Sequence, residues 1–350
     1  MGRRVRATAA DAGRRGWSTR LRSPSARGIY RWGVKPQPIR TSHIQVIKTG
    51  RTYGAWPLLA ETAEGRLVVL SSSHGGSRCS RWDPETGREV WSVEFYAGGG
   101  PGRAVTCPPG GGAVLASAGE DGVERLDALT GEELSSPYME QVGTVWDVAA
   151  GLLPGGRRFF AGAGHNHRVF RWDAMSGEPL GAPLTGHRGC VMAVTAIPGL
   201  DGTGVIASGD ENGVVLRWDP ETGERIGRPL TGASARISQI TSLVLPAGPT
   251  LLVATDSDST LWRWDASTGE PVGEPISLGS EYPKVAPAVV DGAARLFTSG
   301  SDGMVREWEA ATGELIGTPW AGTDIEVLVR ADGSTLFATG SPEGDISLYE

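Results

Sequence analysis

The sequence predicts an all-β fold: a seven-bladed β-propeller with four antiparallel strands per blade and a ring closed by an N-terminal strand in the last blade. Two observations lead to it. A phrase close to Arg-Trp-Asp-x-x-Thr-Gly-Glu recurs along the chain at intervals of 41 to 46 residues, a period typical of propeller blades. The 350 residues also include 52 glycines and 23 prolines, which suits an all-β protein with many tight turns.

One large apolar residue anchors the phrase in each unit. The seven anchors are Trp82, Leu126, Trp172, Trp218, Trp264, Trp308 and Tyr349. A single blade cannot bury both faces of its sheet, so it needs neighbours, and a ring supplies them. We therefore predict that the five tryptophans among these anchors are structural and fill the space between adjacent blades.

The fourth unit shows how a repeat divides into four strands. The predicted strands are residues 191–197, 205–208, 214–218 and 225–230. Asn212-Gly213 is a favoured hairpin turn between the second and third strands. The turn before the last strand is Asp219-Pro220-Glu221-Thr222-Gly223, in which proline presets φ and glycine supplies the left-handed position.

A proline recurs at one place in four of the units. Proline cannot donate to a strand ladder, so it belongs on an edge strand. We predict that these residues lie on the outermost strand of their blades: Pro183, Pro229, Pro275 and Pro319.

The last unit lacks its outer strand, because the chain ends at Glu350 directly after the third. Residues 43–48 form an alternating segment ahead of the first complete unit and supply the missing strand. We predict that they pair beside the strand ending at Tyr349. The propeller then spans residues 41–350, and deleting residues 41–50 should lower the melting temperature strongly, whereas removing residues 1–38 should not.

The units resemble WD repeats of the bacterial type. The Trp-Asp ending stands at residues 82–83, 172–173, 218–219 and 264–265, and a Gly-His start stands at 186–187. The resemblance covers residues 41–350 and implies a role as an interaction platform. It also implies a structural hydrogen-bond chain of His187, Ser208 and Trp218, with Asn212 in the place of the family's turn aspartate.

Arginine and aspartate flank the anchor in five units. Residues two apart on a strand share a face. We therefore expect each pair to form a charge-assisted contact within or between blades, and repetition around the ring argues for a structural role. The pairs are Arg81/Asp83, Arg125/Asp127, Arg171/Asp173, Arg217/Asp219 and Arg263/Asp265.

The residues that vary between units gather at one end of the predicted ring. Four histidines fall in loops at that end: His74, His165, His167 and His187. Four more residues stand at the start of first strands, near the central channel: Trp56, Arg103, Trp146 and Met192. Loops on a rigid scaffold often carry binding residues, and exposed aromatics and arginine are common binding hot spots. We expect these eight residues to bind a protein or peptide.

Catalytic readings are less well supported. The sequence has no phosphate loop, nucleophile elbow, zinc motif or calcium loop, so we expect no catalytic residues, metal or cofactor. Residues 83–91 resemble a quinoprotein-type propeller repeat that ends in a tryptophan, but the equivalent places elsewhere are glycines. The alternatives that remain open are a quinoprotein-like enzyme and a metal-dependent lyase or lactonase.

Residues 1–40 differ in composition from the rest of the chain. They hold ten arginines, one lysine and one acid, whereas the whole chain has a net charge of −7. We expect a disordered extension, with nucleic-acid binding as the alternative. Three widely spaced cysteines and the lack of an apolar leader predict a cytoplasmic, monomeric propeller with no membrane partner.

Overall fold

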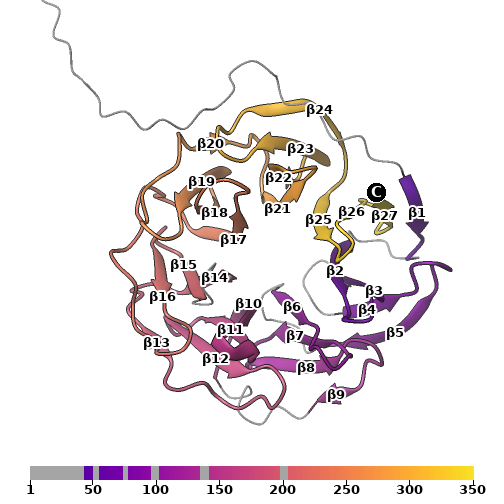
Figure 1. Cartoon of the computed structure of the whole chain (residues 1–350), viewed down its shortest axis with the longest axis horizontal. Helices are drawn as coiled ribbons and strands as arrows, with labels where there is room; N and C mark the ends of the chain where they lie inside the picture. Colours follow the sequence, from indigo (N-terminus) through magenta and orange to yellow (C-terminus); the bar gives the residue numbers. More distant parts are fainter. Residues whose placement is uncertain (1–42, 50–54, 74–77, 96–101, 135–141, 198–203) are drawn as a thin grey trace, which may run out of the picture. The chain divides into compact units, whose positions relative to one another are not determined.

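A computed structural model describes residues 43–49, 55–73, 78–95, 102–134, 142–197 and 204–350. Within these ranges the strands form seven antiparallel sheets arranged as blades around a central channel, as Figure 1 shows. The predicted seven-bladed, all-β fold is confirmed. The Arg-rich segment 1–40 lies outside the described residues.

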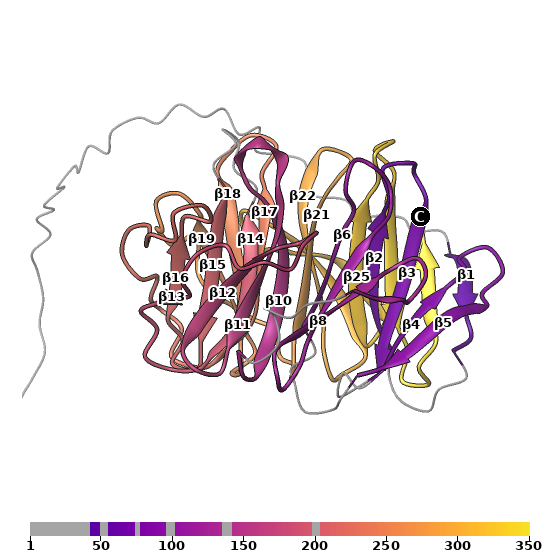
Figure 2. The same cartoon turned by 90° about the horizontal axis from the view of Figure 1, so that it is seen from below.

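Blades 1 to 3 run from the channel outwards in chain order (Figures 1 and 2). Blade 1 consists of β2 (Ala55–Glu61), β3 (Leu67–Ser73), β4 (Arg78–Trp82) and β5 (Glu89–Glu94). Blade 2 consists of β6 (Arg103–Thr106), β7 (Val114–Ala118), β8 (Val123–Asp127) and β9 (Glu133–Leu134). Blade 3 consists of β10 (Val145–Leu152), a short 3-10 turn η1 (Pro154–Gly156), β11 (Arg158–Gly164), β12 (Arg168–Asp173) and β13 (Leu184–Thr185).

Blades 4 to 7 continue the ring. Blade 4 contains β14 (Val191–Ile197), β15 (Val205–Asp210) and β16 (Val215–Trp218). Blade 5 contains β17 (Ile237–Val244), β18 (Thr250–Asp256), β19 (Thr260–Asp265) and β20 (Ile276–Ser277). Blade 6 contains β21 (Lys284–Val290), β22 (Ala293–Ser299), β23 (Met304–Glu309) and β24 (Leu315–Ala321). Blade 7 contains β25 (Asp324–Val329), β26 (Thr335–Gly340), β27 (Ile346–Tyr349) and β1 (His43–Ile47).

The outer segment of blade 4 departs from the predicted strand at 225–230. It pairs with β16 through two isolated bridges, Trp218 to Arg225 and Val215 to Leu230. Between them, Pro229 has no N–H to donate and Gly227 has a φ of 65°, so a continuous ladder is interrupted.

The recurring prolines lie at the outer edge of their blades. Pro319 is inside β24, the outermost strand of blade 6. The other three each stand one residue before an outermost strand or bridge: Pro183, Pro229 and Pro275. None of the four lies on a central strand, so the predicted edge position holds, although only Pro319 is within a continuous strand.

The ring is closed by the N-terminal strand, as predicted. Strand β1 pairs antiparallel with β27, with His43 opposite Tyr349 and Ile47 opposite Ile346. Figure 1 shows β1 beside the C-terminus, at the outer edge of blade 7. Ile47 is completely buried and packs in one apolar cluster with Leu336 and with Trp82 of blade 1.

The core consists of apolar clusters between neighbouring blades. All five predicted structural tryptophans are at most 8% exposed. Trp218 of blade 4, for example, packs against Phe159 and Val169 of blade 3. The expectation that these residues fill the space between blades is therefore confirmed.

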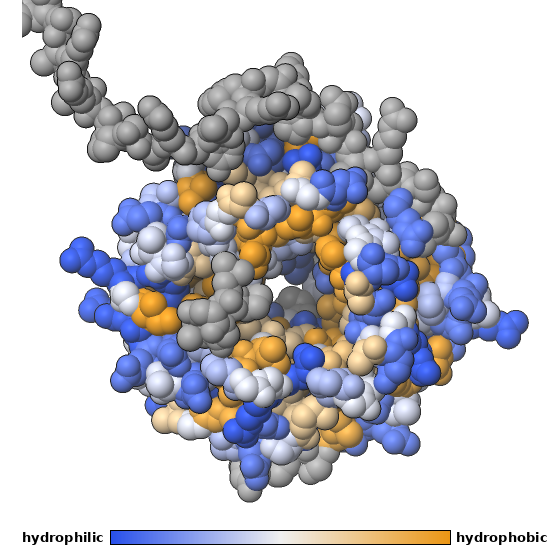
Figure 3. Space-filling model, viewed as in Figure 1, coloured by the Kyte–Doolittle hydropathy of each residue, from blue (hydrophilic) through white to orange (hydrophobic). Residues whose placement is uncertain are grey.

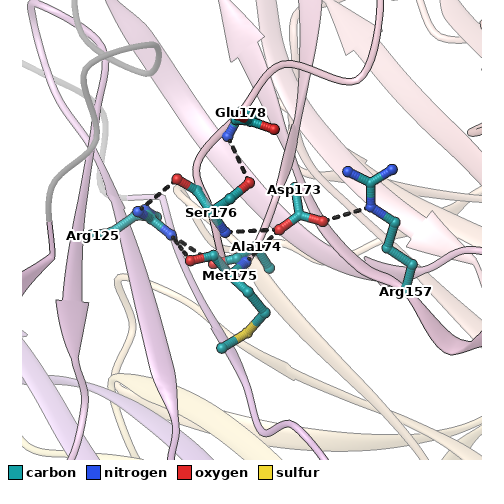
Figure 4. A network of polar contacts seen from close by, with 7 residues as sticks. All are labelled: Arg125, Arg157, Asp173, Ala174, Met175, Ser176 and Glu178. Carbon is teal, nitrogen blue, oxygen red and sulfur yellow. Dashed lines mark hydrogen bonds and ion pairs between the residues drawn. The ribbon is translucent and has the colours of Figure 1, made fainter.

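In blades 1 to 5, an arginine of the repeated phrase links the blade to the turn of the next one. Arg125 donates hydrogen bonds to the main-chain oxygens of Ala174 and Met175 at 2.9 Å, as Figure 4 shows. Arg171, Arg217, Arg263 and Arg81 make equivalent contacts with the following blade.

The aspartates of the phrase stabilise the turns that follow them. Each accepts hydrogen bonds from main-chain N–H groups of its own turn, as Asp173 does from Met175 and Ser176. The expected charge-assisted contact between blades therefore exists. Its acceptors are carbonyl oxygens of the neighbouring turn and not the paired aspartate.

Candidate binding site at the channel mouth

A cavity of about 510 Å³ occupies the channel at the end where the first strands of the blades begin. Figure 3 shows the ring hollowed at its centre, with apolar side chains around the opening. All four residues predicted from first strands line this cavity: Trp56, Arg103, Trp146 and Met192. The sequence reasoning therefore located the mouth of the channel correctly.

Three adjacent blades carry a β-bulge at the mouth. The pairing register shifts between Val145 and Asp147 in blade 3, and at the same place in blades 4 and 5. An extra residue in one strand re-aims the local side chain. The residues skipped by the ladder are Trp146, Met192 and Ser238, and all three line the cavity.

Trp146 has the partial exposure that a binding residue requires. Its side chain is half-buried, and its indole Nε1 is buried without a hydrogen-bond partner among the described residues. The ring lies 6.1 Å from the ring of His165, whose Nδ1 is 3.4 Å from Cys190 Sγ. His165 therefore extends the aromatic surface of the mouth outwards.

Three carboxylates line the inner part of the cavity near one lysine. Asp147 belongs to blade 3, Asp324 and Glu326 to blade 7, and Lys284 to blade 6. Burial raises the pKa of Asp147 and of Asp324 to about 6, despite the opposing effect of Lys284. Burial and the neighbouring Asp324 raise the pKa of Glu326 to about 8. Removal from water disfavours the ionised form of a carboxyl group. The raised pKa values therefore show that Lys284 does not fully compensate the negative charge of the three acids.

Two polar residues of the mouth join adjacent first strands. Asp147 accepts hydrogen bonds from its neighbour Val148 and from Val194 of blade 4, at 2.9 and 3.0 Å. Gln239 of blade 5 exchanges two hydrogen bonds with the main chain of Val285 in blade 6. These contacts join the first strands of blades 3 and 4 and those of blades 5 and 6.

Cationic side chains at the mouth lie over aromatic rings. The Lys284 ammonium is 5.2 Å from the centre of the Trp56 ring, and the Arg103 guanidinium is 5.1 Å from that of Phe95. Such contacts stabilise a cation that has given up water. Burial lowers the pKa of Arg103, which marks its position inside the wall of the cavity.

Of the four predicted histidines, His187 is not available to a partner. Its side chain is 1% exposed, and its ring contacts Asp210 Oδ2 at 3.0 Å and Ser208 Oγ at 2.7 Å. Trp218 Nε1 donates to the same Ser208 oxygen at 2.8 Å. The predicted chain of His187, Ser208 and Trp218 therefore exists, and its burial corrects the assignment of His187 to the binding surface.

The acidic member of this chain also needs correction. Asp210 takes the place given to Asn212, because it stands at the end of β15 and accepts the N–H groups of Asn212 and Val214. His167 is exposed, with a φ of 66°, and does not line the cavity. His74 lies outside the described residues.

Sequence reasoning missed Asp147, Lys284, Asp324 and Glu326. All four stand at or next to the start of a first strand, the position that singled out Trp146 and Met192. Examining every polar residue near the start of a first strand would have found these four. No group of three or more potential metal ligands is present among the residues that the structure describes. Likewise, no helix in that part of the chain is long and apolar enough to cross a membrane.

Comparison with protein families identifies the type of repeat. The family model described as outer membrane protein assembly factor BamB, a PQQ-repeat β-propeller, matches residues 2–272. A search of curated proteins finds none that matches this chain.

The family match overturns the resemblance to WD repeats. The period and the buried tryptophan are demands of blade packing, so they do not separate the two repeat types. The better signal was the unit at residues 83–91. Its Trp91 lies over the turn of blade 2, donating from Nε1 to the Ala128 oxygen at 3.3 Å, and a Cβ on Gly131 would lie 2.8 Å from its ring.

Proposed function

Because this chain belongs to the PQQ-repeat β-propeller family described as outer membrane protein assembly factor BamB, we propose that it is a non-catalytic scaffold that binds a protein or peptide at the channel mouth. The family includes both interaction scaffolds and quinoprotein-like enzymes. The observation that carries the proposal is the chemically varied mouth, where half-buried Trp56, Trp146 and Met192 line one cavity.

The opposite end of the ring supports this choice by contrast. There the blades present nearly identical turns, and the aspartate of each turn is already engaged. Asp219, for example, accepts the N–H groups of Glu221 and Thr222 at 2.9 and 2.7 Å. A surface that repeats itself offers few features to an asymmetric partner.

The charge of the cavity argues against the quinone after which the PQQ repeat is named. That cofactor is a polyanion with several carboxylate groups. Ionised Asp147, Asp324 and Glu326 would repel it, and of the cationic residues lining the cavity only Lys284 opposes the rise of their pKa values. These acidic residues do not fit the quinone.

Affinity purification of the tagged chain from its own cells, with mass spectrometry, tests the proposal. We expect Trp146→Ala combined with Arg103→Ala to weaken capture of specific partners by about 2 kcal/mol, roughly thirtyfold. Because Arg103 is largely desolvated, Trp146→Ala with Met192→Ala serves as a second mouth variant, and thermal melting of each variant verifies folding. The matched control is Glu221→Ala with Thr222→Ala on the opposite end.

Partners retained by both folded mouth variants would contradict the proposal. So would partners lost equally from the control. Turnover of a small substrate, abolished by the same mouth variants, would favour the enzyme alternative.

We also propose that the chain is a cytoplasmic monomer. All three cysteines are among the described residues and none forms a disulfide, which fits a reducing compartment. Cell fractionation and light scattering test this pair of statements. Recovery of the chain with outer membranes, the location in the family description, would contradict the first, and a dimeric mass would contradict the second.

A further inference from the structure

We infer that Asp324 and Glu326, at the inner end of the channel mouth, receive a basic side chain of the partner polypeptide. This inference rests on the proposed function and deepens it, because it names the chemistry by which the partner is recognised. It is carried by a buried and a half-buried carboxylate without ion pairs, by the surrounding cavity and by the aromatic residues that line it.

The two carboxyl groups lie on one face of β25. Residues two apart on a strand point the same way, and both line the cavity. Asp324 is 6% exposed, and its Oδ1 accepts the N–H of Ile325 at 2.8 Å. Among the described residues, neither Asp324 Oδ2 nor the half-buried Glu326 carboxylate has a hydrogen bond or an ion pair. Carboxylates removed from water usually have such partners, so a cation is missing here.

The cations already present do not supply the missing partner. Lys284 is near enough to influence both acids electrostatically, but its ammonium lies over the Trp56 ring and forms no ion pair with either. Arg103 lies over Phe95, and Arg236 is at the exposed rim. Asp147 adds a third carboxylate to the same cavity. Of the three cationic residues that line the cavity, only Lys284 affects the pKa values of Asp324 and Glu326, so an incoming cation would balance their charge.

The shape of the site favours a side chain over a metal ion. Although three carboxylates line the cavity, no three potential ligand groups among the described residues are placed so that they could hold one metal ion. The same cavity is also lined by Trp56 of the adjacent blade 1 and by Trp146 and Met192 of blades 3 and 4. A basic side chain carries its charge on an apolar stem, which these residues can contact while the charged end reaches the carboxylates.

Binding of small probes to the full chain tests the inference. The probes are n-butylguanidinium and n-butylammonium, with n-butylurea as the neutral control of similar size. Binding is followed through the indole N–H resonances of the nitrogen-15-labelled tryptophans, with the Trp56 signal identified by Trp56→Phe. We expect saturable shifts of the Trp56 signal with one or both cations and none with the urea.

Charge-removing variants locate the bound cation. Glu326→Gln and Asp324→Asn should each weaken binding at least tenfold, and the indole spectrum of each shows whether it is folded. Glu221→Gln, in an exposed turn at the opposite end of the ring, removes one charge as the matched control and should bind normally.

Three results would overturn the inference: no shift with any probe, equal shifts with the urea, or unchanged binding in both folded variants. If no cation binds but the Trp146 variants still lose their partners, only this inference fails and the proposed function stands. If cations bind but the mouth variants still capture their partners normally, the proposed function fails. The partner polypeptide is then also excluded as the source of the cation.

Discussion

Nη1 of Arg217 donates a hydrogen bond to the main-chain oxygen of Ala266, 2.8 Å away in the turn of the next blade. The same guanidinium reaches the oxygens of Ser267 and Thr268. The turn must contain glycine for this approach, because a Cβ on Gly269 would lie 2.7 Å from Arg217 Nη2 and its φ is +81°. The arginine therefore joins two blades by satisfying carbonyl groups that the turn leaves unpaired.

Arg217→Met should destabilise the propeller by about 2 to 4 kcal/mol, because it leaves the buried Ala266 oxygen and two part-buried carbonyl oxygens without donors. Arg217→Lys should recover only part of the loss, since an ammonium cannot span three oxygens in the same plane. Urea denaturation measures the difference. Arg225→Met, at an exposed position of the same blade, is the control and should change stability by less than about 0.5 kcal/mol.

Ile47→Ala should lower the free energy of unfolding by about 2 to 4 kcal/mol, because Ile47 is completely buried between blades 7 and 1. Val46→Ala, one residue away and 38% exposed, is the matched control and should have little effect. Thermal or urea unfolding of both variants decides the matter. Equal losses would mean that β1 contributes through its backbone pairing and not through its buried face.

Asp210→Asn should destabilise the protein at neutral pH but progressively less in acid. Desolvation pushes the pKa of Asp210 upwards, but hydrogen bonds from His187, Val214 and Asn212 outweigh it, so the pKa lies below its ordinary value. A lowered folded-state pKa gives stability that is present above the unfolded-state pKa and lost as pH falls through the folded-state pKa. Urea unfolding at pH 7 and about pH 3 should therefore show the two proteins converging in acid.

Glu326→Gln should have the opposite pH dependence. The pKa of Glu326 is raised to about 8 by burial and Asp324, against Lys284, and Asp147 lines the same cavity. A raised folded-state pKa gives stability that is present at low pH and is lost as pH rises towards about 8. Glutamine mimics the protonated acid, so the variant should equal the wild type near pH 4 and exceed its stability by a few kcal/mol at about pH 9. A constant difference across this range would contradict the assignment.

Features repeated around the ring were predictable from the sequence. The anchor position, occupied by Trp218 in blade 4, recurs at a fixed period because a large apolar residue is needed between neighbouring blades. Residues 43–48 were identifiable because one outer strand was missing. The repeat family was misjudged because both repeat types meet the same packing demands. Asn212 was taken for Asp210 because the two lie in one tight turn, where a shift of two residues leaves the pattern intact.

The chemistry of the mouth was only partly predictable. Trp146 and Met192 stood out as large residues at strand starts. Each lies at a β-bulge, and because a bulge has no characteristic sequence comparable to that of a turn, the bulges were not predicted. Asp324 and Glu326 read as ordinary polar positions of an alternating strand. The face of β25 that carries them lines the channel only because the seven blades close into a ring, and the sequence of a single strand does not show this.

The pairing of β1 with β27 also limits the order in which the protein can fold during its synthesis. Lys48 follows β1 and forms an ion pair with Asp345, 297 residues further along the chain. A ribosome therefore releases β1 long before its partner exists, and this strand must wait unpaired while six blades emerge. Such distant contacts form slowly, and an unpaired edge invites association with other chains. We therefore expect β1 to pair with β27, and the ring to close, only after both strands have been synthesised.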